Sequence, residues 1–172
     1  MSLFFETRRV VALAIVLALA CDFAQADAGT WRIGTDDDGL VTASVHATNK
    51  LITGGGALSY SPILTIACRP DSQPRWTEWL QLNDTVSANR KITMSVTVDG
   101  DNKFDESWLV GPRGRMLVRD GADGIKRLTA ANRLQLSWRF GLLSGRGHAD
   151  FDLTGFDEAV SQLAGSCNTA MP

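Results

Sequence analysis

The side chains that could carry chemistry are few, and they lie far apart in the sequence. Two acidic clusters stand out, at 36–38 (DDD) and within 99–106 (DGDNKFDE), where the cluster is formed by Asp99, Asp101 and Asp105. Carboxylate oxygens are ligands for Ca²⁺, but neither cluster has the twelve-residue spacing with a terminal Glu that a known calcium loop requires. Each cluster lies where the chain is expected to turn, so we interpret both as solvated turns. No metal and no cofactor are predicted.

Nucleophilic and acid–base chemistry is also poorly supported. His46 lies on the polar face of an expected strand and His148 beside Gly147, and neither has an inferable nucleophile with a positioned partner. The segment 53–56 (TGGG) lacks the Lys-Ser/Thr that completes a phosphate-binding loop, and we interpret it as a flexible loop. The sequence therefore predicts no catalytic residue and a non-enzymatic protein.

The cysteines predict one disulfide bond. Of the three, Cys21 lies in the N-terminal leader described below, which leaves Cys68 and Cys167. In an oxidising export compartment, such an even pair is expected to bond. The bond would close a loop of roughly 100 residues, and the chain-entropy treatment gives it about 4–5 kcal/mol.

Tryptophan suggests a surface for a partner. The chain has five, Trp31, Trp76, Trp79, Trp108 and Trp138. Some of these are expected in the core of a small β domain. Trp76 and Trp79 are three residues apart, so in a regular strand they point to opposite faces and only one of them is buried. We predict a partner surface at Trp76 and Trp79.

Composition indicates one ordinary globular domain. The 172 residues are 44% hydrophobic and 21% charged, with 17 Lys and Arg against 19 Asp and Glu, a net charge of −2. A chain with this balance has no strong overall basic field, which disfavours nucleic acid and an acidic membrane surface as partners.

The first residues resemble an export signal. Arg8 and Arg9 precede the apolar run 10–20, and small residues at Ala24, Ala26 and Ala28 allow cleavage after Ala26 or Ala28. We therefore assign 1–26 to a signal peptide and 27–172 to a single domain, periplasmic or secreted, with no stable membrane span after cleavage. The run is about half of the roughly 20 residues that a bilayer crossing needs, so a membrane anchor is disfavoured. Attachment as a lipoprotein through Cys21 and export by a twin-arginine signal are minor hypotheses for the same segment.

Periodicity in the rest of the chain predicts many strands. Apolar residues alternate with polar ones at 41–47, 92–98, 134–140 and 149–153, and β-rich runs occupy 63–68, 77–82, 106–110 and 116–119. The turn residues at 99–102 predict a hairpin between the strands that flank them. A short helix is expected within 123–132.

The C-terminal segment predicts an amphipathic helix at about 155–167. Its apolar face consists of Phe156, Ala159, Val160, Leu163, Ala164 and Cys167. Thr154 is the expected N-cap, and Asp157 and Glu158 lie in the first turn, where they complement the helix dipole. The predicted fold class is mainly β, an antiparallel β-sandwich of about 7–9 short strands with this helix packed on it.

The order of several short blocks is similar to a known family. The blocks are Trp31, 36–47 (DDDGLVTASVHA), Pro62 with 63–69 (ILTIACR), Trp79-Leu80, 96–101 (VTVDGD) with Ser107-Trp108, 128–140 (LTAANRLQLSWRF) and 151–167 (FDLTGFDEAVSQLAGSC). In this order they resemble the VasI/TagO family of periplasmic proteins associated with type VI secretion, and the likeness spans nearly all of the domain. The chain departs from the family at 167–169, where Cys-Asn-Thr replaces the usual Cys-Gly-Trp, which suggests a divergent member.

The resemblance implies a non-enzymatic accessory protein that assists assembly or positioning of an envelope machine, with a protein partner in the cell envelope. It carries over no catalytic residue. Two different functions stay open: a cell-wall-binding or wall-hydrolase-associated module, and a secreted toxin inhibitor of the immunity type.

Overall fold

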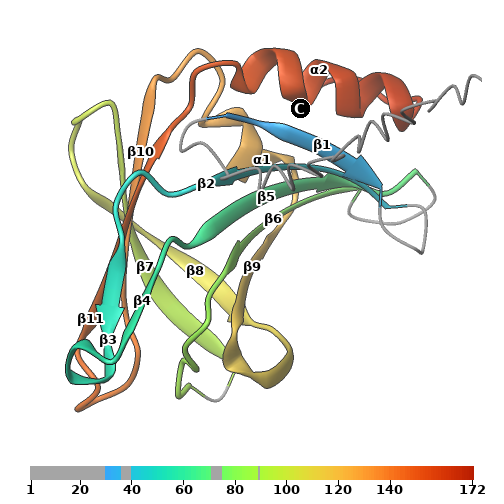
Figure 1. Ribbon diagram of the computed structural model, residues 1–172. Helices are drawn as coiled ribbons and strands as arrows, with labels where there is room; N and C mark the ends of the chain where they lie inside the picture. Colours follow the sequence, from blue (N-terminus) through green and yellow to red (C-terminus); the bar gives the residue numbers. More distant parts are fainter. Residues whose placement is uncertain (1–29, 36–39, 71–74, 89) are drawn as a thin grey trace, which may run out of the picture.

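The computed structural model describes residues 30–35, 40–70, 75–88 and 90–172 (Figure 1). The predicted signal peptide, Cys21 and the acidic run 36–38 lie outside the described residues, so the interpretations that concern them stay predictions. Across the described ranges, no helix is both long and apolar enough to cross a membrane.

The described chain is mainly antiparallel β-structure with a C-terminal helix, which confirms the predicted fold class. One sheet of nine strands has the order β1-β2-β5-β6-β9-β8-β7-β10-β11, and β3 and β4 form a separate two-stranded sheet. The strands are β1 (Arg32–Thr35), β2 (Val41–His46), β3 (Leu51–Thr53), β4 (Leu58–Tyr60), β5 (Ile63–Cys68), β6 (Trp76–Gln81), β7 (Lys91–Val98), β8 (Phe104–Val110), β9 (Met116–Asp120), β10 (Arg133–Arg139) and β11 (Arg146–Asp152). The helices are α1 (Ala122–Lys126) and α2 (Phe156–Ser166), with short 3₁₀ turns at Gly54–Gly56 and Pro112–Gly114.

Alternation along the strands gives the large sheet an apolar inner face. Residues that lie opposite each other in neighbouring strands share a face. Leu64 is opposite Leu80 and Leu136 is opposite Val96, and all four are fully buried. Residues of both halves of the curled sheet belong to one hydrophobic core. The two layers of the predicted sandwich are thus two halves of one continuous sheet.

The sheet curls until its last strand meets the chain that leaves β2. The N–H of Thr48 donates to the carbonyl of Asp150 in β11 at 2.7 Å. The side chain of Asn49 accepts a bond from the Asp150 N–H at 2.8 Å and donates to the His148 carbonyl at 3.0 Å. Because these bonds use backbone groups that an edge strand leaves unpaired, β11 is protected from pairing with another chain.

Helix α2 packs on β1, β2 and β5, across the top of the molecule in Figure 1. The predicted apolar face is buried throughout, from Phe156 to Cys167. The helix begins one position later than an N-cap at Thr154 requires: Gly155 holds the N-cap position at φ 81°, and no side chain caps the helix. The chain enters the helix through a left-handed residue, a conformation that is inexpensive only for glycine. Gly155 therefore takes the N-cap position, and the prediction of Thr154 as N-cap was wrong.

Three short strands were not predicted. β1 is exposed at every position, so it has no alternation to detect. β3 and β4 have three residues each and flank Gly54–Gly56, which forms a 3₁₀ turn and not a flexible loop. The hairpin of β7 and β8 lies where it was predicted, and α1 overlaps the first part of the range 123–132 in which a short helix was expected.

Candidate functional site

The predicted disulfide joins the end of β5 to the end of α2. Cys68 and Cys167 are bonded, with Cα atoms 6.2 Å apart and a sequence separation of 99. Both residues are almost fully buried. The bond therefore ties the helix to the sheet, and it offers no accessible sulfur for chemistry.

The predicted partner surface at Trp76 and Trp79 is reduced to one residue. Both lie in β6, and they point to opposite faces as expected. Trp76 is on the inner face and only 5% exposed, so it gives almost no surface to a partner, and that part of the prediction was wrong. Trp79 is half-buried on the outer face, opposite Thr65 and Val118 in the adjacent strands. Whether a partner contacts Trp79 stays a prediction.

The acidic cluster at 99–106 forms the predicted turn, and part of it also supports the fold. Asp99 has φ 50°, and its carboxylate accepts hydrogen bonds from the N–H groups of Asn132 and Arg133 at 2.9 and 2.7 Å. Asp105 accepts a bond from the Ser95 hydroxyl at 2.7 Å. Within the described residues, no three His, Cys, Asp or Glu side chains gather in a group that could hold a metal ion.

A cluster of four charged side chains, which sequence reasoning missed, lies on the inner face of the sheet. Arg127, just after α1, donates from Nη1 and Nη2 to the two carboxylate oxygens of Glu78 at 2.8 and 3.0 Å. Its Nε lies 3.1 Å from Glu106, whose other oxygen lies 3.3 Å from Nε of Arg119. The indole of Trp108 donates to that oxygen at 3.0 Å. Two carboxylates and two guanidinium groups thus balance in charge.

Burial is the largest influence on the pKa values of Glu78 and Arg127. Burial raises the pKa of Glu78 above the ordinary carboxyl value, and the charge of Arg127 offsets part of that rise. Burial is the largest influence on the pKa of Arg127 and acts to lower it, but the charge and hydrogen bonds of Glu78 and the charge of Glu106 together outweigh burial, so the net direction is upward. A Cβ at position 124 would lie 2.7 Å from Oε2 of Glu78, so glycine leaves the room that the ion pair needs. We assign the cluster a structural role, which is to hold α1 against β6.

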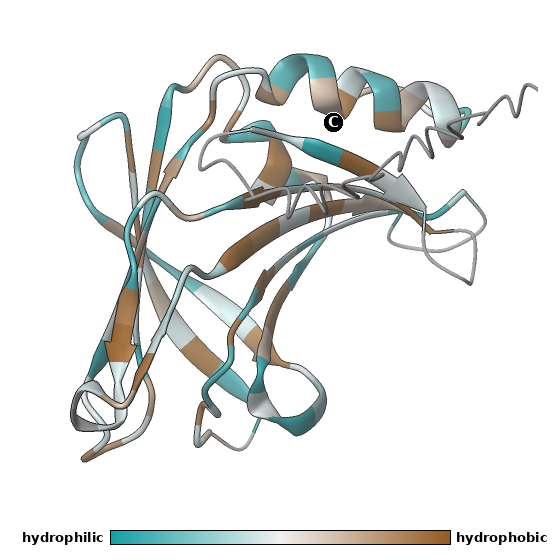
Figure 2. Cartoon of the chain, in the orientation of Figure 1, coloured by the Kyte–Doolittle hydropathy of each residue, from teal (hydrophilic) through white to brown (hydrophobic). Residues whose placement is uncertain are grey.

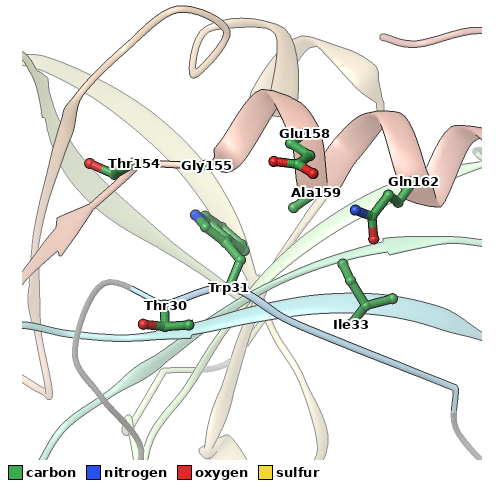
Figure 3. A pocket seen from close by; sticks show the side chains of 8 residues that line it. All are labelled: Thr30, Trp31, Ile33, Thr154, Gly155, Glu158, Ala159 and Gln162. Carbon is green, nitrogen blue, oxygen red and sulfur yellow. The ribbon is translucent and has the colours of Figure 1, made fainter.

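A groove opens between the start of the described chain and α2 (Figure 3). Its volume is about 350 Å³, and its lining includes Trp31, Ile33, Glu158 and Gln162. The indole Nε1 of Trp31 is buried and has no hydrogen-bond partner among the described residues. The ring itself packs edge-on against Phe156 at 5.4 Å. The groove is open and shallow, and the tryptophan serves mainly to seat α2.

Four segments meet at the opposite end of the sheet, at the bottom of Figure 1: the β3–β4 hairpin (51–60), the chain 82–88, the β8–β9 loop (111–115) and the β10–β11 loop (140–145). Asp84 accepts a hydrogen bond from the Thr53 hydroxyl at 2.6 Å, which joins the hairpin to the chain 82–88. The N–H of Val86 donates to the Gly114 carbonyl in the β8–β9 loop at 2.8 Å. The N–H of Ser87 donates to the β10–β11 loop at 2.6 Å. We call these four segments and the strand ends beside them the basic end.

The basic end carries exposed apolar side chains. Leu142 and Leu143 lie at the tip of the β10–β11 loop and are 94% and 100% exposed, so almost nothing in the described chain covers them. In the neighbouring hairpin, Ile52 is 66% exposed and Leu58 is 49% exposed. Figure 2 shows apolar colour at this lower tip. Two adjacent leucines with no cover are unusual on a folded surface and point to a contact with something outside the chain.

The same end gathers positive charge. Its basic residues are Arg90, Lys91, Arg113, Arg115, Arg139 and Arg146, all of them exposed. None of these takes part in an ion pair between described residues. The only acidic residue in the four described segments is Asp84, which is held by Thr53. These basic side chains, which we call the rim, therefore lie at the same end of the sheet as the apolar tip.

No family model, curated protein or solved structure matches this chain. The residues themselves therefore carry the functional argument. Of the features described, the basic end is the one that combines almost fully exposed leucines with exposed basic groups that form no ion pair within the described chain.

One spectroscopic prediction checks the packing that shapes the basic end. Tyr60, the only tyrosine, receives a hydrogen bond from the Asp84 N–H at 3.4 Å. Burial, together with the neighbouring carboxylate of Asp84, raises the pKa of Tyr60 to about 12. We expect tyrosinate absorbance in the folded protein to rise with a midpoint near that value, against about 10 in denaturant.

The sign of the linked stability follows from that shift. Because the folded pKa is raised, the contribution of Tyr60 to stability is complete below about pH 10 and is lost as pH rises toward 12. Near-ultraviolet circular dichroism, recorded in parallel, shows that the chain is still folded. A midpoint near 10 in the folded protein would mean that the hairpin does not pack on the chain 82–88.

Proposed function

We propose that this protein is an exported, non-enzymatic accessory protein of the cell envelope that docks on its partner through the basic end. The observation that carries the proposal is the pair Leu142 and Leu143, fully exposed at a loop tip between two arginines, Arg139 and Arg146. Loops held by a rigid sheet are common places for binding residues. The resemblance to the VasI/TagO family supports a role in assembling or positioning a type VI secretion machine.

Two further observations support export and a binding role. The buried disulfide is compatible with an oxidising compartment, to which the predicted signal peptide would direct the chain. The charged cluster at Glu78 and Arg127 is closed off from solvent and leaves little for a substrate to reach.

The free energy gained when an exposed leucine becomes buried makes Leu142 and Leu143 the first residues to substitute. Moving one leucine side chain from water into an apolar contact contributes about 1.5–3 kcal/mol, so two of them supply a large share of a typical binding energy. Serine at both positions removes that contribution. It leaves the fold intact, because neither side chain is buried in the free protein.

The test is affinity capture from a crosslinked envelope fraction with the C-terminally tagged mature protein. We compare wild type, the double variant Leu142→Ser/Leu143→Ser, and Phe104→Ser as a matched control. Phe104 is also an exposed apolar residue, 42% exposed, but it starts β8 at the other end of the sheet. We expect the double variant to lose about tenfold or more of the captured partner and the control to lose none.

The outcomes separate the classes of function. Capture of secretion-machine subunits that depends on the leucines supports the proposal. Capture of one small toxin-like protein would replace it with the inhibitor function, and recovery of wall fragments alone would replace it with the wall-binding function. Equal capture by wild type and the double variant would show that docking occurs elsewhere, with Trp79 as the next position to change.

A further inference from the structure

We propose that the basic end binds the surface of an anionic phospholipid bilayer, with the leucine tip in the acyl boundary and the arginine and lysine rim among the phosphates. This inference rests on the proposed function, in that it assigns the occupant of the same docking end. It concerns peripheral binding and requires no membrane-spanning segment.

The shape of the apolar surface favours a bilayer over a protein pocket. Leu142 and Leu143 are almost wholly exposed in a loop, and Ile52 is 66% exposed in the adjacent hairpin, so these side chains offer apolar surface to the outside at this end of the molecule. A stable protein interface buries about 800 Å² on each partner, so a protein would have to contact much of the basic end besides the two leucines. A membrane interface needs no such patch, because a few apolar side chains that enter the headgroup boundary already contribute.

The charges around the tip complement anionic headgroups. Arg139 and Arg146 close the hairpin directly behind the leucines, opposite each other in register. Arg113 and Arg115 lie in the β8–β9 loop, and Arg90 is hydrogen-bonded through its carbonyl to the Val110 N–H at 2.7 Å, at the same end. Lysine and arginine side chains near an anionic membrane surface are attracted to it, and all of these are exposed and without an ion pair in the described chain.

Negative charge at the far end orients the molecule. The basic residues there, Lys103, Lys126 and Arg133, are outnumbered by acidic ones, which include Asp99, Asp101, Asp120, Asp123, Asp157 and Glu158. Hydrogen bonds join two of these acidic segments to the chain 130–133: Asp99 accepts a bond from the N–H of Arg133, and Asp157 accepts one from the N–H of Ala130. An anionic surface repels this end and attracts the basic end, so the protein approaches end-on, with α2 directed away from the bilayer.

Flotation of the mature protein with vesicles tests the inference. We use vesicles of phosphatidylglycerol and of pure phosphatidylcholine, at low and high salt. The proteins are wild type, Leu142→Ser/Leu143→Ser, Arg139→Glu/Arg146→Glu, and Phe104→Ser as the control. We expect wild type and control to float with phosphatidylglycerol and not with phosphatidylcholine, and each double variant to bind at least about tenfold more weakly.

Salt dependence gives a second readout that a purely apolar contact would not show. Binding of wild type is expected to weaken as salt rises, and Arg139→Glu/Arg146→Glu should flatten that dependence. Thermal melting of each variant confirms that it is folded. Failure of wild type to float with phosphatidylglycerol, or unchanged binding of the leucine variant, would overturn the membrane assignment.

The affinity capture from envelopes shows whether only the membrane assignment has failed or whether the proposed docking end has failed as well. If wild type does not bind vesicles but the leucine variant still loses a captured protein, the docking end stands and its occupant is a protein. If neither vesicle binding nor capture depends on the leucines, the docking end itself is wrong.

Discussion

Replacing both Cys68 and Cys167 with alanine is expected to lower the free energy of unfolding by about 4–5 kcal/mol. The bond closes a segment with a sequence separation of 99, and in the chain-entropy treatment its main effect is to restrict the unfolded chain. Natural domains have only about 5–15 kcal/mol of stability, so the loss is a large fraction of the total. Urea unfolding, followed by tryptophan fluorescence, measures it directly.

Reduction of the wild-type protein is the matched control for that variant. Reduced wild type and the double alanine variant should unfold at similar urea concentrations, both well below oxidised wild type, since both lack the crosslink. In both proteins α2 loses its covalent tie to β5. Identical midpoints for oxidised and reduced wild type would contradict the stabilising role of the bond.

The substitution Arg127→Met is expected to lower the free energy of unfolding by about 3–5 kcal/mol. Methionine fills similar space, but it leaves the fully buried carboxylate of Glu78 without its two charged hydrogen bonds. An unpaired buried charge is far more costly than an apolar replacement of the whole pair. The double variant Glu78→Gln/Arg127→Met should therefore lose less stability than the single variant.

The pH dependence distinguishes an unpaired charge from a simple packing defect. Burial already raises the pKa of Glu78, and removal of Arg127 takes away the largest opposing influence. A carboxyl group with a raised folded pKa stabilises the fold below its unfolded pKa, and that contribution is lost as pH rises through the folded value. The deficit of the single variant should therefore shrink on acidification.

Arg133→Met is the control for this experiment, because Arg133 is an exposed arginine in β10. We expect a change of less than about 0.5 kcal/mol there, as for most surface substitutions. A loss below about 1 kcal/mol for Arg127→Met, or a deficit that does not change with pH, would mean that the buried ion pair does not hold α1 in place.

Alternation of apolar and polar residues was enough to predict β2, β7, β10 and β11, and helical spacing was enough to predict α2. The other long strands were predicted from β-rich runs, and one of them, β5, is buried on both faces. Alternation failed for β1, which has no buried face, and for β3 and β4, which are too short to show a period. The curl of the sheet depends on bonds between Asn49 and β11 across about a hundred residues, and no local pattern reveals such contacts. The fold class was therefore predictable, whereas closure of the sheet was not.

The candidate site was much less accessible to sequence reasoning. The net charge of −2 argued against an acidic membrane surface, because an average over the chain hides the separation of charge between its two ends. The separation arises only when the register brings loops as distant as 82–88, 111–115 and 140–145 to one end.

For the buried ion pair of Glu78 and Arg127, one signal was present in the sequence but was missed. Glu78 alternates with Trp76 and Leu80, so it had to lie on the apolar face and needed a buried partner.

Site-specific photocrosslinking tests the central claim most directly. A photoreactive benzoylphenylalanine is placed at position 143 or, in a second protein, at exposed position 101 in the acidic turn between β7 and β8. Both are irradiated in intact envelopes. The account predicts an adduct, with lipid or with an envelope protein, from position 143 and none from position 101. An adduct from position 101 with none from position 143 would contradict it.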